Sequence, residues 1–279
     1  MRIDAHQHFW RISDRVGQWP PTDLTLIYRD FGPDDLEPLL AAAGFDGTVL
    51  VQTMEREADT AYMLGLADRQ SFIKAVVGWT DLKAPDAADA VARLAVHPRL
   101  KGLRPMLQDV PDDDWIVDPA LAPAIETMVD HELAFDALVL PRHLRPLLDF
   151  AVRYTALRIV VDHGAKPAIA DGHISAWRAD MAALAERPNV WCKLSGLLTE
   201  AGGRGLAAVR PYAETLLDLF GPERLIFGSD WPVLRLAGDY GDWVAFCREI
   251  VPAEHYDAVF GGNATSFYRL DSTPSAARI

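Results

Sequence analysis

Cysteine, long apolar runs and positive charge are all scarce in this chain of 279 residues. Its two cysteines, Cys192 and Cys247, are too few for a disulfide framework and are typical of a reducing compartment. No apolar run approaches the ~18 residues of a membrane span, and the amino terminus lacks the charged and apolar regions of a secretion signal. We therefore expect a cytoplasmic protein that makes no membrane contact.

The charge balance is strongly acidic, with 27 Lys and Arg against 40 Asp and Glu and a formal net charge of −13. Nucleic-acid binding requires clustered basic side chains that neutralise phosphates, so we expect no nucleic-acid partner. Half of the residues are hydrophobic, which is enough for one large core. The expected partner is a small molecule, and the number of subunits does not follow from the sequence.

Short β-rich segments alternate with longer helical patterns along the whole chain. Several of these segments are Val/Ile/Leu runs, which are typical of parallel strands buried on both faces. Eight such strand–helix pairs predict an α/β fold, a distorted (β/α)₈ TIM barrel. An open doubly wound sheet would normally need a Gly-rich turn after the first strand, and "HQHFWR" is not one. The strands are expected at residues 2–8, 47–53, 73–79, 100–105, 133–139, 157–163, 189–195 and 224–230.

One connection is unusually long. Roughly 25 residues, 9–32, separate the first predicted strand from its helix, whereas most connections in compact domains have ~4–6 residues. Long loops of this kind are often functional. We therefore expect a single domain over residues 1–279 with a lid-like loop at about 9–32.

Polar side chains gather where the predicted strands end, which is where the active sites of such barrels lie. His6 and His8 are two residues apart and so face the same side of the first strand. Barrel closure places strand eight beside strand one, which brings Asp230 next to this pair. His163 approaches from strand six, and Arg104 ends strand four. These five residues form the predicted catalytic site.

Neighbouring residues receive a lesser role or none. Alternation of side chains predicts that Asp162 faces away from His163 and is a structural partner. Asp4 shares the parity of His6 and is expected to hold a histidine in position from below. No role is assigned to the two polar residues of strand seven, Lys193 and Ser195.

Four segments carry a family resemblance: "DAHQHFW", "VVDHGAKP", "FGSDWP" and "GGNATSFYRL". Together they resemble the amidohydrolase superfamily, and more narrowly its branch of sugar and aromatic-derived lactonases, from Met1 to about Leu270. The "HFW" opening combined with "GSDWP" is most similar to the L-fuconolactonase and L-rhamnonolactonase type. The resemblance implies a hydrolase that opens the ester bond of an aldonolactone, with His6, His8, His163 and Asp230 in active-site positions.

The resemblance also raises the question of a metal, because the superfamily is best known for one or two divalent ions. A two-metal member would carry a carboxylated Lys or a Glu at the end of strand four and a histidine on strand five. Here strand four ends in Arg104 and "LAFDALVLP" contains no histidine, so a binuclear centre is not expected. His6, His8 and Asp230 suit one Zn²⁺ with an open position for water. Some lactonases of this branch work without a metal, so catalysis need not depend on it.

For a lactone, Asp230 is expected to act as general base on the attacking water and to return the proton to the leaving ring oxygen. Burial should raise the pKa of this carboxyl from about 4 toward neutrality. His6 and His8 would polarise the carbonyl, through a metal or directly, with Arg104 and His163 assisting.

Substrate contacts are expected at the barrel mouth, where flat aromatic faces suit a sugar ring. A dicarboxylate would usually be clamped by paired arginines, and only Arg104 is firmly placed there, with Arg142 and Lys166 as further candidates. This balance favours a neutral sugar lactone. The tryptophans assigned to substrate binding together with Arg104 are Trp10, Trp79 and Trp231.

Two alternatives remain open at this stage. A metal-dependent decarboxylase or hydrolase of an aromatic-derived acid or lactone would share the paired histidines and the strand-eight Asp, but would require a tightly held metal and a cationic carboxylate pocket. A non-catalytic barrel that only binds a sugar acid would be expected to lack the base, and Asp230 is present.

Overall fold

The computed structural model describes residues 1–270, and residues 271–279 of the expected domain lie outside the described part. Its single sheet has eight parallel strands in sequential order. The predicted (β/α)₈ barrel is confirmed, although the strands end one to three residues earlier than predicted. They are β1 (Ile3–Gln7), β2 (Gly47–Val51), β3 (Ile73–Gly78), β4 (Leu100–Leu103), β5 (Ala134–Ala137), β6 (Ile159–Val161), β7 (Val190–Leu194) and β8 (Leu225–Phe227).

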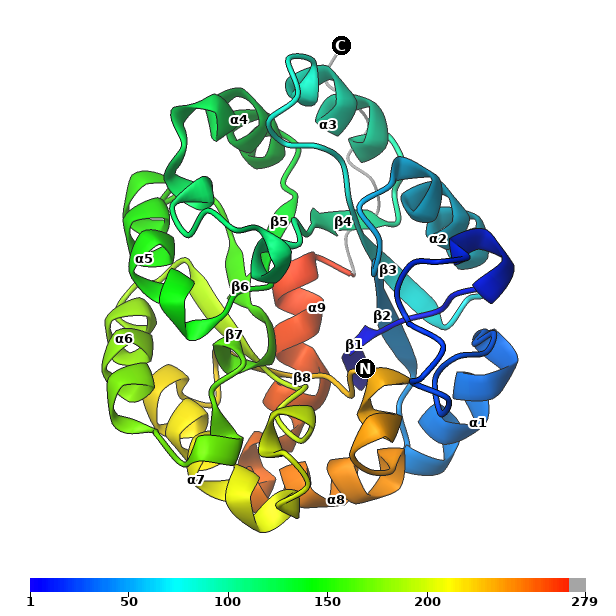
Figure 1. Ribbon diagram of the computed structural model, residues 1–279, viewed down its shortest axis with the longest axis vertical. Coiled ribbons are helices and arrows are strands. Elements are labelled where there is room, and N and C mark those ends of the chain that lie inside the picture. The colour runs from blue at the N-terminus through cyan, green and yellow to red at the C-terminus, as the bar shows by residue number, and fades with distance from the viewer. Residues whose placement is uncertain (271–279) are drawn as a thin grey trace.

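A ring of helices surrounds the strands, as Figure 1 shows. The first of them follows the capping preferences of its sequence, because Asp35 accepts the backbone N–H of Gly32 at 3.0 Å and Gly44 takes the left-handed conformation after the last turn. The helices of the ring are α1 (Pro33–Ala43), α2 (Glu57–Arg69), α3 (Ala87–Ala95), α4 (Ala122–Asp130), α5 (Leu144–Arg153), α6 (Ser175–Ala185), α7 (Gly205–Phe220) and α8 (Tyr240–Ile250).

The strands separate two apolar cores. Inward-facing residues such as Ala5, Val77 and Ile226 form a small inner core, and a last helix, α9 (Asn263–Tyr268), packs against it with Phe267 and Tyr268. The alternate residues of the strands face the helix ring and belong to a much larger outer core. The strands that lead to the predicted site are therefore held between two packed layers.

The barrel closes between β8 and β1, and it does so just beyond the strand ends. The N–H of Asp230 donates to the carbonyl of His6 at 2.8 Å, and the N–H of His8 donates to the carbonyl of Trp231 at 2.8 Å. A single parallel bridge, Gln7 to Trp231, marks this contact. Closure therefore joins the two segments that carry the predicted site.

The register of β1 shifts between Asp4 and Gln7, and this shift decides which side chains face inward. Ala5 lies in the inner core, yet His6 also lies inside the barrel. Asp4 therefore does not share the face of His6, contrary to our expectation, although it does hold this histidine by accepting its backbone N–H at 3.2 Å. Its carboxylate accepts hydrogen bonds from the Ser229 N–H at 2.8 Å and from the hydroxyl of Tyr240 on α8 at 3.1 Å. Asp4 thus ties the closure to the helix ring.

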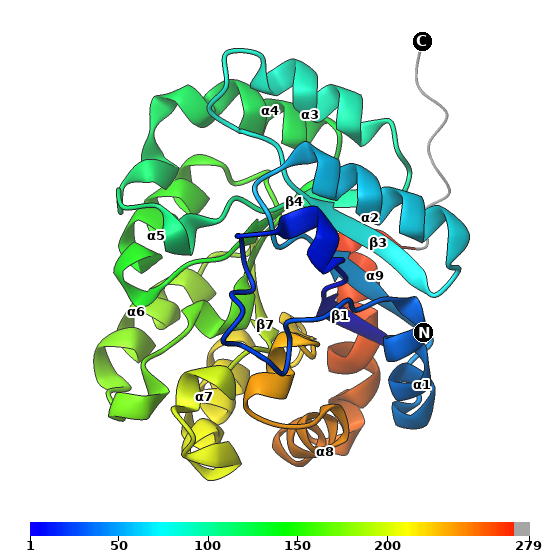
Figure 2. The same ribbon diagram turned by 45° about the vertical axis from the view of Figure 1, so that its right-hand side comes forward.

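The long connection between β1 and α1 contains a short 3₁₀ helix, Ile12–Arg15, and crosses in front of the barrel in Figure 2. Its base is closed by mutual backbone hydrogen bonds of 3.0 Å between Trp10 and Phe31. Its middle is held by the buried guanidinium of Arg15, which donates to the Thr53 hydroxyl at 2.9 Å and pairs with Asp59 at 3.3 Å. The segment is therefore anchored to the start of α2.

Among residues 1–270, no helix has the length and hydrophobicity that crossing a bilayer would require.

We expect Arg15→Met to destabilise the fold by about 3–5 kcal/mol at pH 7, because it leaves the carboxylate of Asp59 buried without its cation. Burial, opposed by Arg15, already raises the pKa of Asp59. Without Arg15 this pKa rises further. A raised folded-state pKa contributes stability that is lost as pH rises, so the deficit should grow from about pH 4 to pH 7. Urea unfolding at both pH values measures it.

The control is Arg29→Met in the same segment, because Arg29 pairs with Asp35 at the surface. An exposed pair contributes about 1 kcal/mol or less, so this variant should unfold almost like the wild type. Equal losses in the two variants would contradict the anchoring role of Arg15.

Candidate active site

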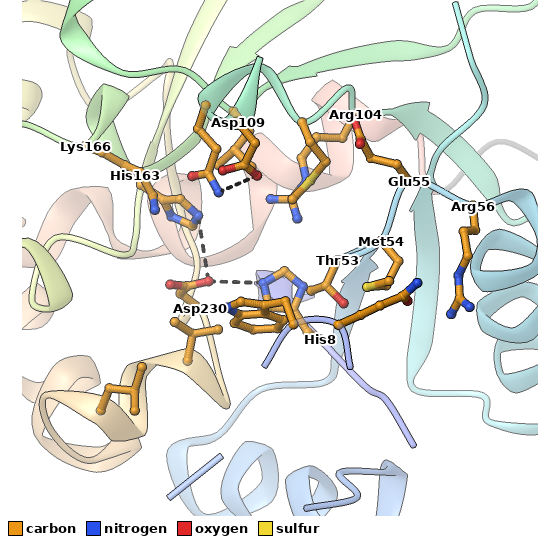
Figure 3. Close-up of a pocket in the computed structure, with 17 residues that line it drawn as sticks. His8, Thr53, Met54, Glu55, Arg56, Arg104, Asp109, His163, Lys166 and Asp230 are labelled. Atoms are coloured by element: carbon orange, nitrogen blue, oxygen red, sulfur yellow. Dashed lines mark hydrogen bonds and ion pairs between the residues drawn. The ribbon is translucent and has the colours of Figure 1, made fainter. Parts of the chain in front are cut away.

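A cavity of about 790 Å³ opens at the carboxyl ends of the strands. Figure 3 shows Asp230, His8 and His163 pointing toward one another on one side of it, with Arg104 and Glu55 on another. The wall also contains Arg56, Asp109 and Lys166, together with apolar residues such as Met54, Met106 and Leu138. The cavity has the size and mixed polarity of a small-molecule site.

Asp230 is the centre of the polar cluster. Its Oδ1 lies 3.1 Å from His8 Nε2, and 3.7 Å from both His6 Nε2 and His163 Nε2. The other nitrogen of His8 contacts the carbonyl of Val51 at 2.7 Å, and His163 Nδ1 contacts the hydroxyl of Ser195 at 2.8 Å. The structure therefore brings together the three histidines and the carboxylate that the sequence placed at strand ends, and Ser195 orients one of them.

Strained backbone and close glycines make this cluster possible. His163 and Asp230 adopt left-handed backbone angles, with φ of 54° and 59°, a conformation that costs about 1–3 kcal/mol and is common at functional sites. Gly228 lies so close to His6 that a Cβ there would be 2.6 Å from the His6 Cβ. At Gly196 a Cβ would be 2.3 Å from His163 Nδ1.

A network of buried charges lies beneath the histidines. The ammonium of Lys193 is 2.6 Å from Asp136 Oδ2 and 3.0 Å from Asp162 Oδ1. The guanidinium of Arg104 contacts the other oxygen of Asp162 at 3.1 Å. From α9, the hydroxyl of Tyr268 donates to Asp136 at 2.6 Å. The network therefore connects β5, β7, the segments just after β4 and β6, and the last helix, and its two cations contact His6.

Asp162 does not face away from the site, and this corrects our expectation. Val160 belongs to the inner core, so Asp162, two residues further, faces the barrel interior in the normal alternation. His163 also turns inward because the strand has ended at Val161 and the backbone of His163 is left-handed. The alternation of side chains therefore does not extend to His163, which lies beyond the end of the strand.

Sequence reasoning missed Asp136 and left Lys193 without a role. Both are charged residues inside strands that are buried on both faces, and charged side chains are almost never fully buried unless they are paired. The runs "LAFDALV" and "NVWCKLS" contained that signal.

The tryptophans that we assigned to substrate binding do not line the cavity. Trp10 is completely buried against Trp19 and Phe31, and Trp231 is buried against Phe31. Trp79 also lies outside the wall. The aromatic side chain that reaches the cavity is Trp19, from the middle of the long connection. The physical reason is that a buried aromatic cluster holds the base of this connection and leaves only its middle over the barrel.

The additional cations considered at the mouth are now placed. Lys166 lines the cavity and pairs with Glu200 at 3.6 Å. Arg142 lies outside the wall, where it pairs with Asp113 at 2.6 Å.

The electrostatics of the cluster keep the carboxylate charged and two imidazoles neutral. Burial lowers the pKa of His163 to about 4 and lowers that of His6 well below its usual value. Burial alone would raise the pKa of Asp230, as we expected, but His163, His8 and His6 outweigh it and the pKa lies below its ordinary value. Asp230 is therefore a stabilised anion and a weaker base than the sequence argument assumed.

The donor set suits one divalent metal ion. Zinc–ligand bonds of about 2.0–2.1 Å in a tetrahedron place neighbouring ligand atoms roughly 3.3 Å apart. Asp230 Oδ1 is 3.1 Å from His8 Nε2 and 3.7 Å from His6 Nε2, and the ligand atoms of these three buried residues lie within 4.8 Å of one another. The residues that we expected to bind Zn²⁺ therefore fit a mononuclear site.

A family model described as amidohydrolase matches residues 3–270. The chain belongs to this amidohydrolase family. The resemblance inferred from the four sequence segments is therefore confirmed, and it extends over almost the whole chain.

Relatives of this amidohydrolase include two proteins named L-fucono-1,5-lactonase. The one from Burkholderia ambifaria is 57% identical over 278 residues, which cover 97% of this chain and 96% of the relative. The one from Burkholderia multivorans is 38% identical and covers 100% of this chain and 99% of the relative. A crystal structure of an amidohydrolase from Burkholderia multivorans with bound zinc is 37% identical, with a TM-score of 0.90 over 96% of this chain and 99% of that chain.

In this amidohydrolase, we expect Gly228→Ala to destabilise the fold by about 1–3 kcal/mol, the usual cost of overpacking, because the added methyl group must displace the side chain of His6. Gly241→Ala on α8 is the matched control, since a Cβ there meets nothing within 4 Å. It should leave stability unchanged or raise it slightly, as Ala is the better helix former. Thermal unfolding compares the two, and equal midpoints would contradict the tight fit at Gly228.

Proposed function

We propose that this amidohydrolase hydrolyses the ester bond of a sugar lactone, L-fucono-1,5-lactone or a close analogue, to the aldonic acid. The observation that carries the proposal is the carboxylate of Asp230, held by three imidazoles in a cavity of small-molecule size that also contains the guanidinium of Arg104. The two relatives named L-fucono-1,5-lactonase support the substrate class, since both match nearly the whole chain.

The chemistry assigned to these residues is acyl transfer to water. Asp230 takes a proton from the water as its oxygen bonds to the lactone carbonyl carbon. The resulting oxyanion is stabilised by Arg104, whose guanidinium lies 3.3 Å from His6 Nε2, and by the imidazole N–H group of His163. The bond from this carbon to the ring oxygen then breaks, and Asp230 returns the proton to that oxygen. The product is an open-chain hydroxy acid.

The low pKa of Asp230 means that the carboxylate form is always ready but accepts a proton weakly. Proton transfer to it is therefore easiest when the water is made more acidic or the carbonyl more electrophilic. We propose that His6, His8 and Asp230 hold one Zn²⁺ when it is present. Such an ion lowers the pKa of a bound water and polarises a carbonyl.

Charge balance in the cavity supports a neutral substrate. Its cations are Arg56, Arg104 and Lys166, and its acids include Glu55, Asp109 and Asp230. Arg104 is already paired with Asp162 and Lys166 is near Glu200, so no free pair of arginines is available in the wall to clamp a dicarboxylate. A polyhydroxylated lactone ring can hydrogen-bond to both kinds of group.

The balance of acidic and basic side chains in the cavity wall also disfavours a decarboxylase. A decarboxylase of an aromatic acid would need a cationic pocket for the substrate carboxylate, and here the wall carries acids as well as cations. We further propose, as extensions of the lactonase function, that residues 9–32 act as a lid over a single-domain barrel and that the enzyme works in the cytoplasm without nucleic-acid or membrane partners.

Asp230→Asn should lower kcat for L-fucono-1,5-lactone by about 10²–10⁴-fold, the usual contribution of a general base, while the fold is retained. A pH-indicator assay with a panel of aldonolactones measures the acid released, and circular dichroism checks the fold. Near-normal turnover of the variant would refute the role of Asp230. Release of no acid from any lactone by the wild type would refute the lactonase function itself.

Trp19→Leu should raise KM for the lactone about tenfold or more with little change in kcat, because the indole forms part of the cavity wall but has no group that could transfer a proton to the reacting atoms. Trp79→Leu is the control, since Trp79 lies outside the wall and should change KM less than twofold. Steady-state kinetics with both variants test this, and a larger effect at Trp79 would overturn the assignment of Trp19.

A further inference from the structure

The imidazole of His6 lies between two cations. Its Nδ1 is 3.1 Å from Lys193 Nζ, and its Nε2 is 3.3 Å from a guanidinium nitrogen of Arg104. A neutral imidazole has one N–H and one lone pair, so it accepts a hydrogen bond from only one of these donors. The two cations therefore compete for the single lone pair of His6.

Neither cation can easily leave. Lys193 is completely buried and bridges Asp136 and Asp162 at 2.6 and 3.0 Å. Arg104 is held by Asp162 at 3.1 Å and also donates to the carbonyl of Gln52. Moving Lys193 would leave the buried carboxylate of Asp136 without a counterion, and moving Arg104 would remove one of the two cations that neutralise Asp162.

Metal binding makes a specific demand on this ring. The nitrogen that faces Asp230 is Nε2, at 3.7 Å, so a metal shared with Asp230 would need the Nε2 lone pair. The proton of the imidazole would then be on Nδ1, where Asp162 Oδ1 can accept it at 3.4 Å but where the ammonium of Lys193 also points. The same lone pair is the one that Arg104 approaches.

We infer that Arg104 and a divalent metal are alternative partners of His6 Nε2. Arg104 supplies positive charge beside the lactone carbonyl, and it weakens metal binding by taking the lone pair and by repelling a second cation. The inference rests on the proposed function and deepens it, because it identifies the electrophile of the site. Lys193 also opposes metal binding. Its ammonium favours the ring form in which Nδ1 is the acceptor, and in that form Nε2 carries the proton and has no lone pair for a metal.

The test measures zinc affinity rather than turnover. Apo protein is titrated with Zn²⁺ in competition with a chromogenic chelator, for the wild type, Arg104→Met and Arg56→Met. Arg56 is the matched control because its side chain lines the same cavity, while within residues 1–270 no hydrogen bond or ion pair joins it to His6, His8 or His163. Arg104→Gln is prepared as a second variant, in case the methionine variant does not fold, since its amide can still donate to Asp162.

We expect Arg104→Met and Arg104→Gln to bind Zn²⁺ about tenfold tighter or more, a change on the scale by which contacts to a ligand histidine alter metal affinity. Arg56→Met should stay within about twofold of the wild type. Equal affinity in the Arg104 and Arg56 variants would overturn the inference, and so would weaker binding in the Arg104 variants, which would make Arg104 a support of the metal site. If the wild type hydrolysed no lactone, the proposed function would be refuted, but the comparison of zinc affinities would still stand.

Discussion

The site depends on the contact that closes the barrel between β8 and β1. Asp230 and His8 are 222 residues apart, and they meet because two backbone hydrogen bonds of 2.8 Å join the segments just beyond the strand ends. Asp4 reinforces this contact through the backbone of Ser229 and the hydroxyl of Tyr240. One closure therefore sets both the shape of the barrel and the distance between carboxylate and imidazoles.

Below the site, charges occupy the upper part of the barrel interior. Removing an ion from water costs several kcal/mol even after relaxation, so such groups persist only when they are paired. Lys193 pairs with Asp136 and Asp162, and Arg104 pairs with Asp162. An apolar filling would avoid the desolvation cost altogether. The network is better understood from what it surrounds, because its two cations approach the two nitrogens of His6.

Much of the architecture could be predicted from periodicity. All eight strands were located, and the (β/α)₈ order followed from their alternation with helical patterns. The convergence of the three histidines with Asp230 followed from the rule that barrel sites lie at carboxyl strand ends. Errors arose where regular structure stops. The alternation fails at the shifted register of β1 and after Val161, so the faces of Asp4 and Asp162 were assigned incorrectly.

What the sequence determined by itself was the fold, the family segments and the residue types that converge at the strand ends, because hydrophobic period and strand order depend on local pattern. Only the tertiary structure decided which aromatic side chain reaches the cavity, the direction of the Asp230 pKa and the partners of His6. These properties depend on distances of about 3–4 Å between groups from different strands, where burial and charge oppose each other and no local pattern records which prevails.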